Sequence, residues 1–128
     1  MANHNITGKL GENLAVEFLV SHGFEILERN WKFSRAEIDI IAKEEDVLVF
    51  IEVKTRSTIA FGKPEEFVSK KQEELIIDAS QRYMEIKDHN WEIRFDVISI
   101  VLDSIMLDSN IVDHPKKYEI RHYRDVFY

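Results

Sequence analysis

Residues 37–56 read Glu-Ile-Asp-Ile-Ile-Ala-Lys-Glu-Glu-Asp-Val-Leu-Val-Phe-Ile-Glu-Val-Lys-Thr-Arg, and they place acids and a lysine inside two segments that otherwise have the composition of buried strands. Strand interiors rarely hold such charges unless they are paired or functional. Because side chains alternate along a strand, Glu37 and Asp39 share one face of the first segment, and Glu52 and Lys54 share one face of the second. The other face of the first segment is apolar and consists of Ile38, Ile40 and Ala42.

A short polar segment, residues 43–46, separates the two strands and predicts an antiparallel hairpin. A register that pairs Lys43 with Leu48 also places Asp39 directly opposite Glu52. A slip by one residue would undo this pairing, so the register is an assumption at this point. Like charges so placed, with Cβ atoms roughly 4.5–5.5 Å apart, are destabilising unless something neutralises them. Either one carboxyl therefore holds a proton, or a cation bridges the two.

Two carboxylates at this separation suit Mg²⁺, which is usually held by one or two carboxylates and keeps several water ligands. Lys54 lies on the same face as Glu52, where it can position a water molecule or stabilise a phosphate. The same register places Glu37 opposite Lys54, so Glu37 is as good a candidate for the ion-pair partner of Lys54 as for a metal ligand. The spacing alone also allows an ordinary charged hairpin, in which Lys54 pairs with Glu37 and the other two acids are solvated.

The spacing from Asp39 to the triplet Glu52-Val53-Lys54 resembles the PD-(D/E)xK nuclease signature. From about Gly8 to Val101 the chain resembles the YraN-like bacterial family, and the segments that carry this likeness are Gly11-Glu12, Arg29-Asn30, Ala36-Glu37-Ile38-Asp39-Ile40-Ile41-Ala42, Phe50-Ile51-Glu52-Val53-Lys54-Thr55-Arg56 and Arg94-Phe95-Asp96-Val97. The resemblance implies a restriction-endonuclease-like fold and a Mg²⁺-dependent endonuclease, with Mn²⁺ as a substitute, that hydrolyses phosphodiester bonds in DNA. Similarity to Holliday junction resolvases of that superfamily extends the expected substrates to branched or junction DNA. A two-fold symmetric substrate would imply a homodimer.

The resemblance also assigns roles to individual residues. Asp39, Glu52 and the backbone carbonyl of Val53 are expected to hold the metal ion, and Lys54 to orient the attacking water. Archaeal Holliday junction resolvases use a glutamate of their first helix as a further metal ligand, and this role carries over to Glu12. Without the resemblance, Glu12 is more simply a solvated acid in the first turn of a helix, where it favours the helix dipole.

Four cations are candidate phosphate contacts. Lys70 and Lys71 begin a predicted helix, whose N-terminus attracts anions, and the resemblance favours Lys71. Arg35 precedes the acidic hairpin and Arg56 follows it. The alternative is that all four are ordinary surface charges. Residues 57–67 are polar and contain Gly and Pro, so they are a candidate mobile substrate loop.

The remaining elements follow from periodicity. A helix is predicted over about residues 8–21 with Thr7 as its N-cap, and a second one from Ser69, which forms a capping box with Gln72, to about Lys87. Further strands are predicted at residues 24–31, 91–101, 105–107 and 117–123, with a turn at 113–115. The order predicts an α/β protein, a three-layer-like sandwich with a mixed central β-sheet flanked by helices.

Two kinds of polar residue are not assigned to the site. Asp96 is interpreted as a structural acid within the strand at 91–101. The histidines show no metal-ligand spacing and are interpreted as incidental; they are His4, His22, His89, His114 and His122.

The composition is that of a soluble globular protein. At 128 residues, 45% of them hydrophobic, the chain fits a single domain over residues 1–128. It has no apolar run of the roughly 20 residues that a membrane span needs, and no secretory signal is visible, so we expect a cytoplasmic protein without a membrane partner. The absence of cysteine excludes disulfides and thiolate zinc sites.

The net charge of −7 is unfavourable for a protein whose whole surface binds nucleic acid. An acidic nuclease needs its basic residues on one face, with metal ions offsetting part of the acidic site. The acidic balance therefore keeps a second hypothesis open, a non-catalytic nucleic-acid-binding or adaptor protein on a nuclease-like fold.

Overall fold

The structure is a computed structural model that describes residues 2–56, 68–89, 92–102 and 118–127. Its elements, in chain order, are α1 (Ala2–Ser21), β1 (Glu25–Phe33), β2 (Ala36–Glu44), β3 (Val47–Arg56), α2 (Lys70–Ile86), β4 (Ile93–Leu102) and β5 (Tyr118–Tyr123). The proposed substrate loop at 57–67, the predicted strand at 105–107 and the turn at 113–115 lie outside the described residues.

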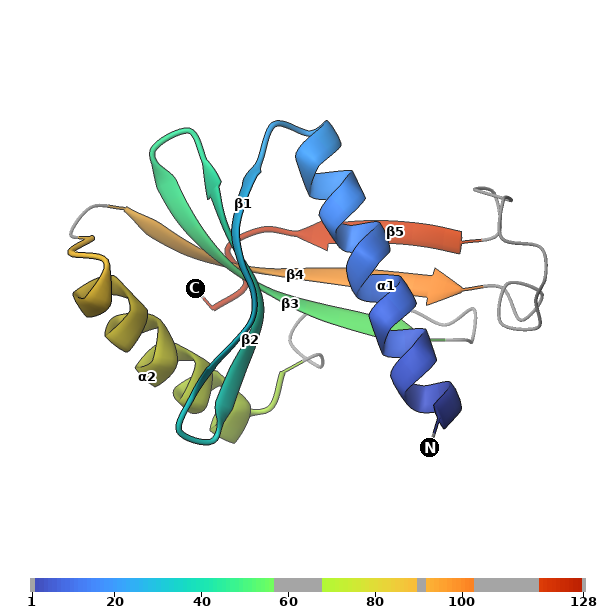
Figure 1. The fold of residues 1–128 in the computed structure, drawn as a ribbon, viewed down its shortest axis with the longest axis horizontal. Coiled ribbons are helices and arrows are strands. Elements are labelled where there is room, and N and C mark those ends of the chain that lie inside the picture. Colours follow the sequence, from blue (N-terminus) through green and yellow to red (C-terminus); the bar gives the residue numbers. More distant parts are fainter. Residues whose placement is uncertain (1, 57–67, 90–91, 103–117, 128) are drawn as a thin grey trace.

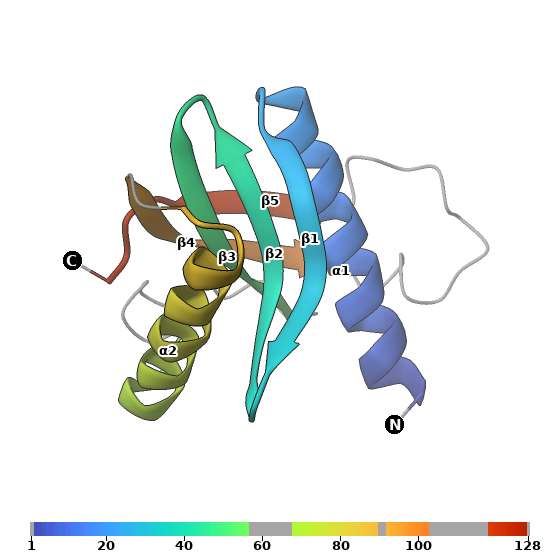
Figure 2. The same ribbon diagram turned by 60° about the vertical axis from the view of Figure 1, so that its left-hand side comes forward.

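The five strands form one sheet in the order β1-β2-β3-β4-β5. Neighbours are antiparallel except β3 and β4, which are parallel and are connected through α2. Figures 1 and 2 show the two helices on opposite sides of this sheet. The predicted α/β architecture with a mixed central sheet between helices is therefore confirmed.

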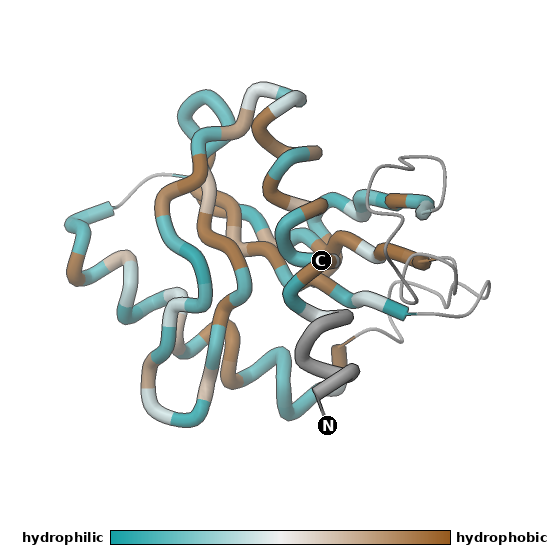
Figure 3. Tube along the Cα trace, turned by 45° about the vertical axis from the view of Figure 1, so that its right-hand side comes forward, coloured by the Kyte–Doolittle hydropathy of each residue, from teal (hydrophilic) through white to brown (hydrophobic). Residues whose placement is uncertain are grey.

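Each face of the sheet has its own apolar core. The α1 face is built around buried residues of the helix and of the central strands, namely Ala15, Leu19, Ile40, Val49, Ile51, Ile98 and Ile100. The α2 face contains Ile38, Ile41, Phe50, Ile76, Ala79, Tyr83 and Phe95. Figure 3 shows where the core residues lie along the chain, with hydrophobic residues in the middle of the strands and hydrophilic residues at the turns. Burial on both faces fixes the sheet between the helices.

Most predicted boundaries agree with the structure to within two or three residues. The exception is the first helix, which begins at Ala2 rather than near Gly8. Thr7 therefore lies inside α1, and its prediction as the N-cap is wrong. The second helix is as predicted, because Ser69 is its N-cap and the hydroxyl oxygen accepts a hydrogen bond from the backbone N–H of Gln72.

The β2–β3 hairpin opens into a fork. Its ladder pairs Lys43 with Leu48, as predicted, and ends with Ile40 opposite Ile51. Beyond that pair β2 continues beside β1 alone, whereas β3 continues beside β4. We call this divergence of β2 and β3 the fork; Figure 1 shows the β1–β2 hairpin leaving the sheet while β3 runs on toward α1.

The strict alternation predicted for the first strand of the hairpin is wrong at the fork. Ile38 packs in the α2 core, together with Ile41, whereas Ile40 and Ala42 pack in the α1 core. The two faces therefore exchange between Ile38 and Ile40, at the position of Asp39. A two-stranded ribbon twists more strongly than a wider sheet, so the segment of β2 that has left β3 turns relative to the rest of the strand.

No helix in the described part of the chain is long and apolar enough to cross a membrane.

Candidate active site

Asp39 and Glu52 are the first residues beyond the β2–β3 ladder, one on each side of the fork. The Oδ2 atom of Asp39 accepts a hydrogen bond of 2.8 Å from the backbone N–H of Val53. The Asp39 side chain thus joins the two strands at the point where their backbone pairing ends. The contact that places Val53 in the site is made by its N–H, and the role expected of its carbonyl oxygen stays a prediction.

The Asp39 and Glu52 carboxyls lie close enough for each to affect the pKa of the other. Burial raises the pKa of Glu52 to about 8, and the neighbouring charge of Asp39 adds to this increase. Burial also raises the pKa of Asp39 to about 6, against the opposing effect of the Val53 N–H. The carboxylate pair therefore carries less than its full charge near neutral pH.

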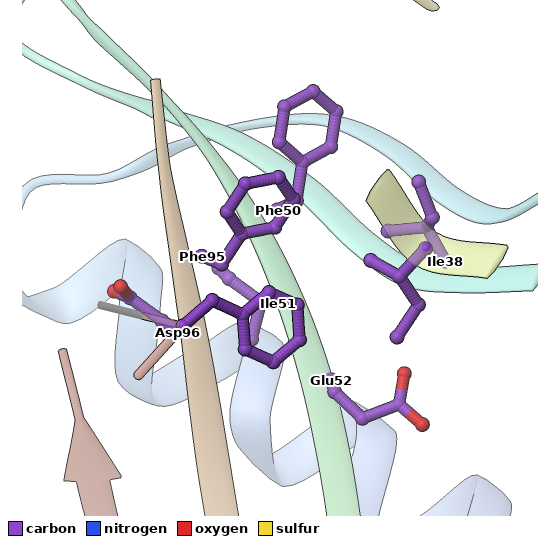
Figure 4. Close-up of a pocket in the computed structure, with 8 residues that line it drawn as sticks. Ile38, Phe50, Ile51, Glu52, Phe95 and Asp96 are labelled. Atoms are coloured by element: carbon purple, nitrogen blue, oxygen red, sulfur yellow. The ribbon is translucent and has the colours of Figure 1, made fainter. Parts of the chain in front are cut away.

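An apolar wall accounts for the burial of Glu52. A cavity of ≈ 10 Å³, about the room for one water molecule, lies behind it and is lined by Ile38, Phe50, Ile51, Glu52, Ile76, Phe95, Asp96 and Phe127. Figure 4 shows the Glu52 carboxyl pointing away from Asp96, on the side of Ile38. In the described part of the chain, Glu52 Oε1 is buried and receives no hydrogen bond from any donor group. A proton or a cation would satisfy this atom.

Gln72, in the first turn of α2, is a site residue that the sequence did not reveal. Its Nε2 donates a hydrogen bond of 2.8 Å to Glu52 Oε2. In a capping box the Gln side chain turns back to bind the N-cap residue, so the contact of Gln72 with Glu52 was not predicted. Only half of the box forms, since the Ser69 hydroxyl accepts from Gln72 while the Gln72 side chain binds Glu52.

Lys54 is paired with Glu52 rather than with Glu37. Its Nζ lies 3.5 Å from Glu52 Oε2, and the Lys54 side chain is 25% exposed. Glu37 is exposed and stands opposite Lys32 in the β1–β2 ladder. Its charge still contributes to the raised pKa of Asp39. The ordinary hairpin in which Lys54 pairs with Glu37 is therefore not the arrangement observed.

Glu12 approaches the fork from α1. Its charge is close enough to raise the pKa of Asp39, and its side chain is 13% exposed. The Oε1 atom accepts hydrogen bonds from Arg29 Nη2 at 3.0 Å and from Asn30 Nδ2 at 2.9 Å. Asn30 holds a left-handed backbone conformation with φ 54°, which Asn tolerates better than most residues. The β1 strand therefore fixes the position of Glu12 beside the carboxylate pair.

Gly11 allows α1 to lie close to the end of β3. A Cβ atom at this position would overlap the side chain of Thr55. The close approach brings the next residue, Glu12, to the fork, so the resemblance at Gly11-Glu12 has a structural reason.

The predicted phosphate contacts surround the site without touching its carboxylates. Lys70 and Lys71 are the exposed first residues of α2, Arg35 is exposed in the turn between β1 and β2, and Arg56 is the exposed last residue of β3. Arg29 differs, because it binds Glu12 and Asn13.

The residues of the fork fit a metal ion only in part. Among the described residues, no group of three or more His, Asp and Glu side chains is arranged to hold one. The pair of Asp39 and Glu52 meets the smaller requirement of Mg²⁺, which often takes one or two carboxylates from the protein. The buried oxygen of Glu52 without a donor is consistent with this chemistry.

Asp96 is the centre of a second polar network, on the α1 side of the sheet. It accepts hydrogen bonds from Arg94 at 2.8 and 2.9 Å and from the backbone N–H of Asp125 at 3.0 Å. His122 Nε2 lies 2.7 Å from Asp96 Oδ2, so the reading of this histidine as incidental is wrong. These bonds hold the pKa of Asp96 below its usual value in spite of burial. Asp96 is thus a structural acid, as predicted.

Comparisons with known proteins identify the family. A family model described as "Uncharacterised protein family UPF0102" matches residues 11–100. A UPF0102 protein of Flavobacterium psychrophilum is 45% identical over 128 residues, which cover 100% of this chain and 98% of the relative. A UPF0102 protein of Dictyoglomus turgidum is 50% identical over 101 residues, or 78% of this chain and 86% of the relative. The chain therefore belongs to the uncharacterised protein family UPF0102, the YraN-like family that its sequence resembles.

Proposed function

We propose that this protein is a metal-dependent endonuclease that hydrolyses phosphodiester bonds in DNA, including branched or junction DNA, in the cytoplasm. The observation that carries the proposal is the pair of buried carboxyls at the fork, Asp39 and Glu52, with the ammonium group of Lys54 3.5 Å from Glu52. Burial of two acids side by side is costly unless a proton or a cation neutralises them, so the fold maintains the pair at the expense of stability. The restriction-endonuclease-like assignment of the fold is part of this proposal.

The chain's own residues have distinct roles in the proposed reaction. Asp39 and Glu52 would hold Mg²⁺, which would supply a water of lowered pKa and offset charge on the phosphate. Lys54 orients the attacking water, and Gln72 keeps the Glu52 carboxyl in place through its bond of 2.8 Å to Oε2. Glu12, held by Arg29 and Asn30, adds negative charge on the α1 side of the site.

The direct test is cleavage of a panel of DNA forms, from linear duplex to four-way junction, with Mg²⁺ or Mn²⁺. Asp39→Ala and Lys54→Ala should abolish cleavage while the fold persists. Asp46→Ala and Lys43→Ala are the matched controls, because both residues belong to the opposite end of the same hairpin, and they should cut like the wild type. Equal cutting by the site variants and the wild type would exclude the proposed site.

Titration with Mn²⁺ separates this proposal from the non-catalytic adaptor that the net charge of −7 favours. A nuclease should bind Mn²⁺ in a manner that requires both Asp39 and Glu52. The same protein in sedimentation analysis, with and without a two-fold symmetric junction, tests the homodimer.

A further inference from the structure

The cations of the described chain divide into two groups by their pairing. Those that make ion pairs away from the fork belong to the C-terminal part of α2, to β4 and to the residues from β5 onward, and they are Arg82, Lys87, Arg94, Arg121 and Arg124. Among the described residues, those that make no ion pair are Lys9, Lys32, Arg35, Lys43, Arg56, Lys70 and Lys71. All of this second group except Lys43 lie around the fork, and we call these six the fork cations.

Four fork cations lie on the α2 side. Arg35 belongs to the β1–β2 turn, and Lys70 and Lys71 are the first residues of α2. Arg56 ends β3 on the same face as Glu52, because side chains alternate along the strand and Thr55 faces α1. Figure 1 shows the β1–β2 turn and the N-terminal end of α2 at the same end of the molecule. The backbone N–H groups of a helix N-terminus add to the positive potential of the two lysines.

Two fork cations lie on the α1 side. Lys32 alternates with Trp31 and Phe33, which pack in the α2 core, so its side chain points to the α1 side of the sheet. Lys9 precedes Glu12 by three residues on α1, so the two side chains are neighbours on one face of the helix. Lys9 and Lys32 are both exposed. The carboxylate pair of the fork therefore lies between two groups of free cations.

Six of the twelve exposed acids in the described part of the chain lie at the other end of the molecule. They belong to the C-terminal half of α1, the start of β1, the β2–β3 turn, the end of α2 and the residue before β4, and they are Glu17, Glu25, Glu45, Asp46, Asp88 and Glu92. Figure 1 shows the β2–β3 turn and the C-terminal end of α1 at the top, with the β1–β2 turn and both helix N-termini below. The fork end keeps some acids, among them Glu37 opposite Lys32.

We propose that the fork cations bind the phosphate backbones of duplex DNA, so that the net charge of −7 conceals a basic surface around the site. This inference rests on the proposed function for its choice of polyanion. The two groups of cations lie on opposite sides of the sheet, so their common ligand must span its thickness. A duplex is already stiff, with a persistence length of about 150 base pairs, whereas a flexible single strand would have to be ordered on binding.

The test measures binding without cleavage. Fluorescence anisotropy in EDTA with a hairpin-capped duplex of about sixteen base pairs, over a series of salt concentrations, gives the affinity and its salt slope. Lys9→Gln and Lys32→Gln should each lower the slope by about one and weaken binding about three- to tenfold at moderate salt. Lys43→Gln is the matched control, because Lys43 makes no ion pair with any described residue and lies at the acidic end. It should bind like the wild type.

Several outcomes would overturn the inference. They are no duplex binding at low salt, equal loss in Lys43→Gln, and equal affinity for a single strand of the same length. Mn²⁺ titration of the same variants keeps the two proposals apart, since Lys9 and Lys32 contact none of the site carboxylates. If Mn²⁺ binds but the fork cations do not affect duplex affinity, only the inference about this surface fails. If the duplex binds through the fork cations but Mn²⁺ does not bind, the proposed nuclease fails instead.

Discussion

Replacing Glu52 by Gln should make the protein more stable and, at the same time, remove its metal binding. In the fold, burial raises the pKa of Glu52 from 4.5 to about 8. At pH values above 4.5 the unfolded chain ionises Glu52 whereas the fold keeps it neutral, and this difference lowers the free energy of unfolding. At pH 7 the cost is on the order of 3 kcal/mol. Gln has the same shape, can accept from Gln72 and can donate to Asp39. Glu52 is mostly neutral at pH 7, and the effect of Lys54 is already part of its raised pKa, so no separate ion-pair loss is subtracted. We therefore expect a gain of about 3 kcal/mol at pH 7.

The sign of the pH dependence follows from the raised pKa. The stability that protonated Glu52 contributes is fully present below pH 4.5 and is lost as the pH rises toward about 8. Urea unfolding in EDTA at several pH values should give Glu52→Gln and the wild type the same free energy of unfolding at low pH. The free energy of unfolding of the variant should exceed that of the wild type by an amount that grows up to pH 8. Glu119→Gln, at an exposed acid of β5, is the control and should follow the wild type. A variant that is no more stable than the wild type at pH 8 would refute the reasoning. Added Mn²⁺ should stabilise only the wild type and the control.

Three further substitutions test the supports of the site. Gln72→Leu should weaken Mn²⁺ binding about tenfold in calorimetry without unfolding the protein, whereas Gln81→Leu, on the same helix, should not. Gly11→Ala should destabilise by about 1–3 kcal/mol in urea unfolding, because its Cβ would overlap β3, while Gly8→Ala, which meets nothing within 4 Å, should be neutral or stabilising. Asp96→Asn should lower the melting temperature and cost about 3–5 kcal/mol at pH 7, with the loss shrinking as the pH falls below 3.8, because the pKa of Asp96 is depressed in the fold. Unchanged values for these variants would contradict the corresponding contacts.

The hairpin could be predicted because its information is local. The polar turn and the alternation of side chains determine which residues face each other, and the register with Lys43 opposite Leu48 followed from them. The crowding of Asp39 and Glu52 followed in turn from that register. Alternation failed at Ile38, because the change of face there depends on β2 leaving β3, and no residue of β2 signals that divergence.

Contacts between distant segments were harder to predict. Gln72 has a complete local explanation as part of a capping box, and only the packing of α2 against the sheet shows that its side chain binds Glu52. His122 lies 26 residues from Asp96 in the chain, and strand periodicity carries no information about such a pair. Glu12 was assigned by resemblance, whereas the residues that hold it, Arg29 and Asn30, emerged from the structure.

The residues after β5 help to close the apolar wall behind Glu52. Val126 donates to the carbonyl of Phe95, and the ring of Phe127 stacks on that of Phe95 at 5.0 Å. Phe127 also lines the cavity behind Glu52. Without this ring one wall of the cavity would be open to water, so Phe127 contributes to the burial that raises the pKa of Glu52.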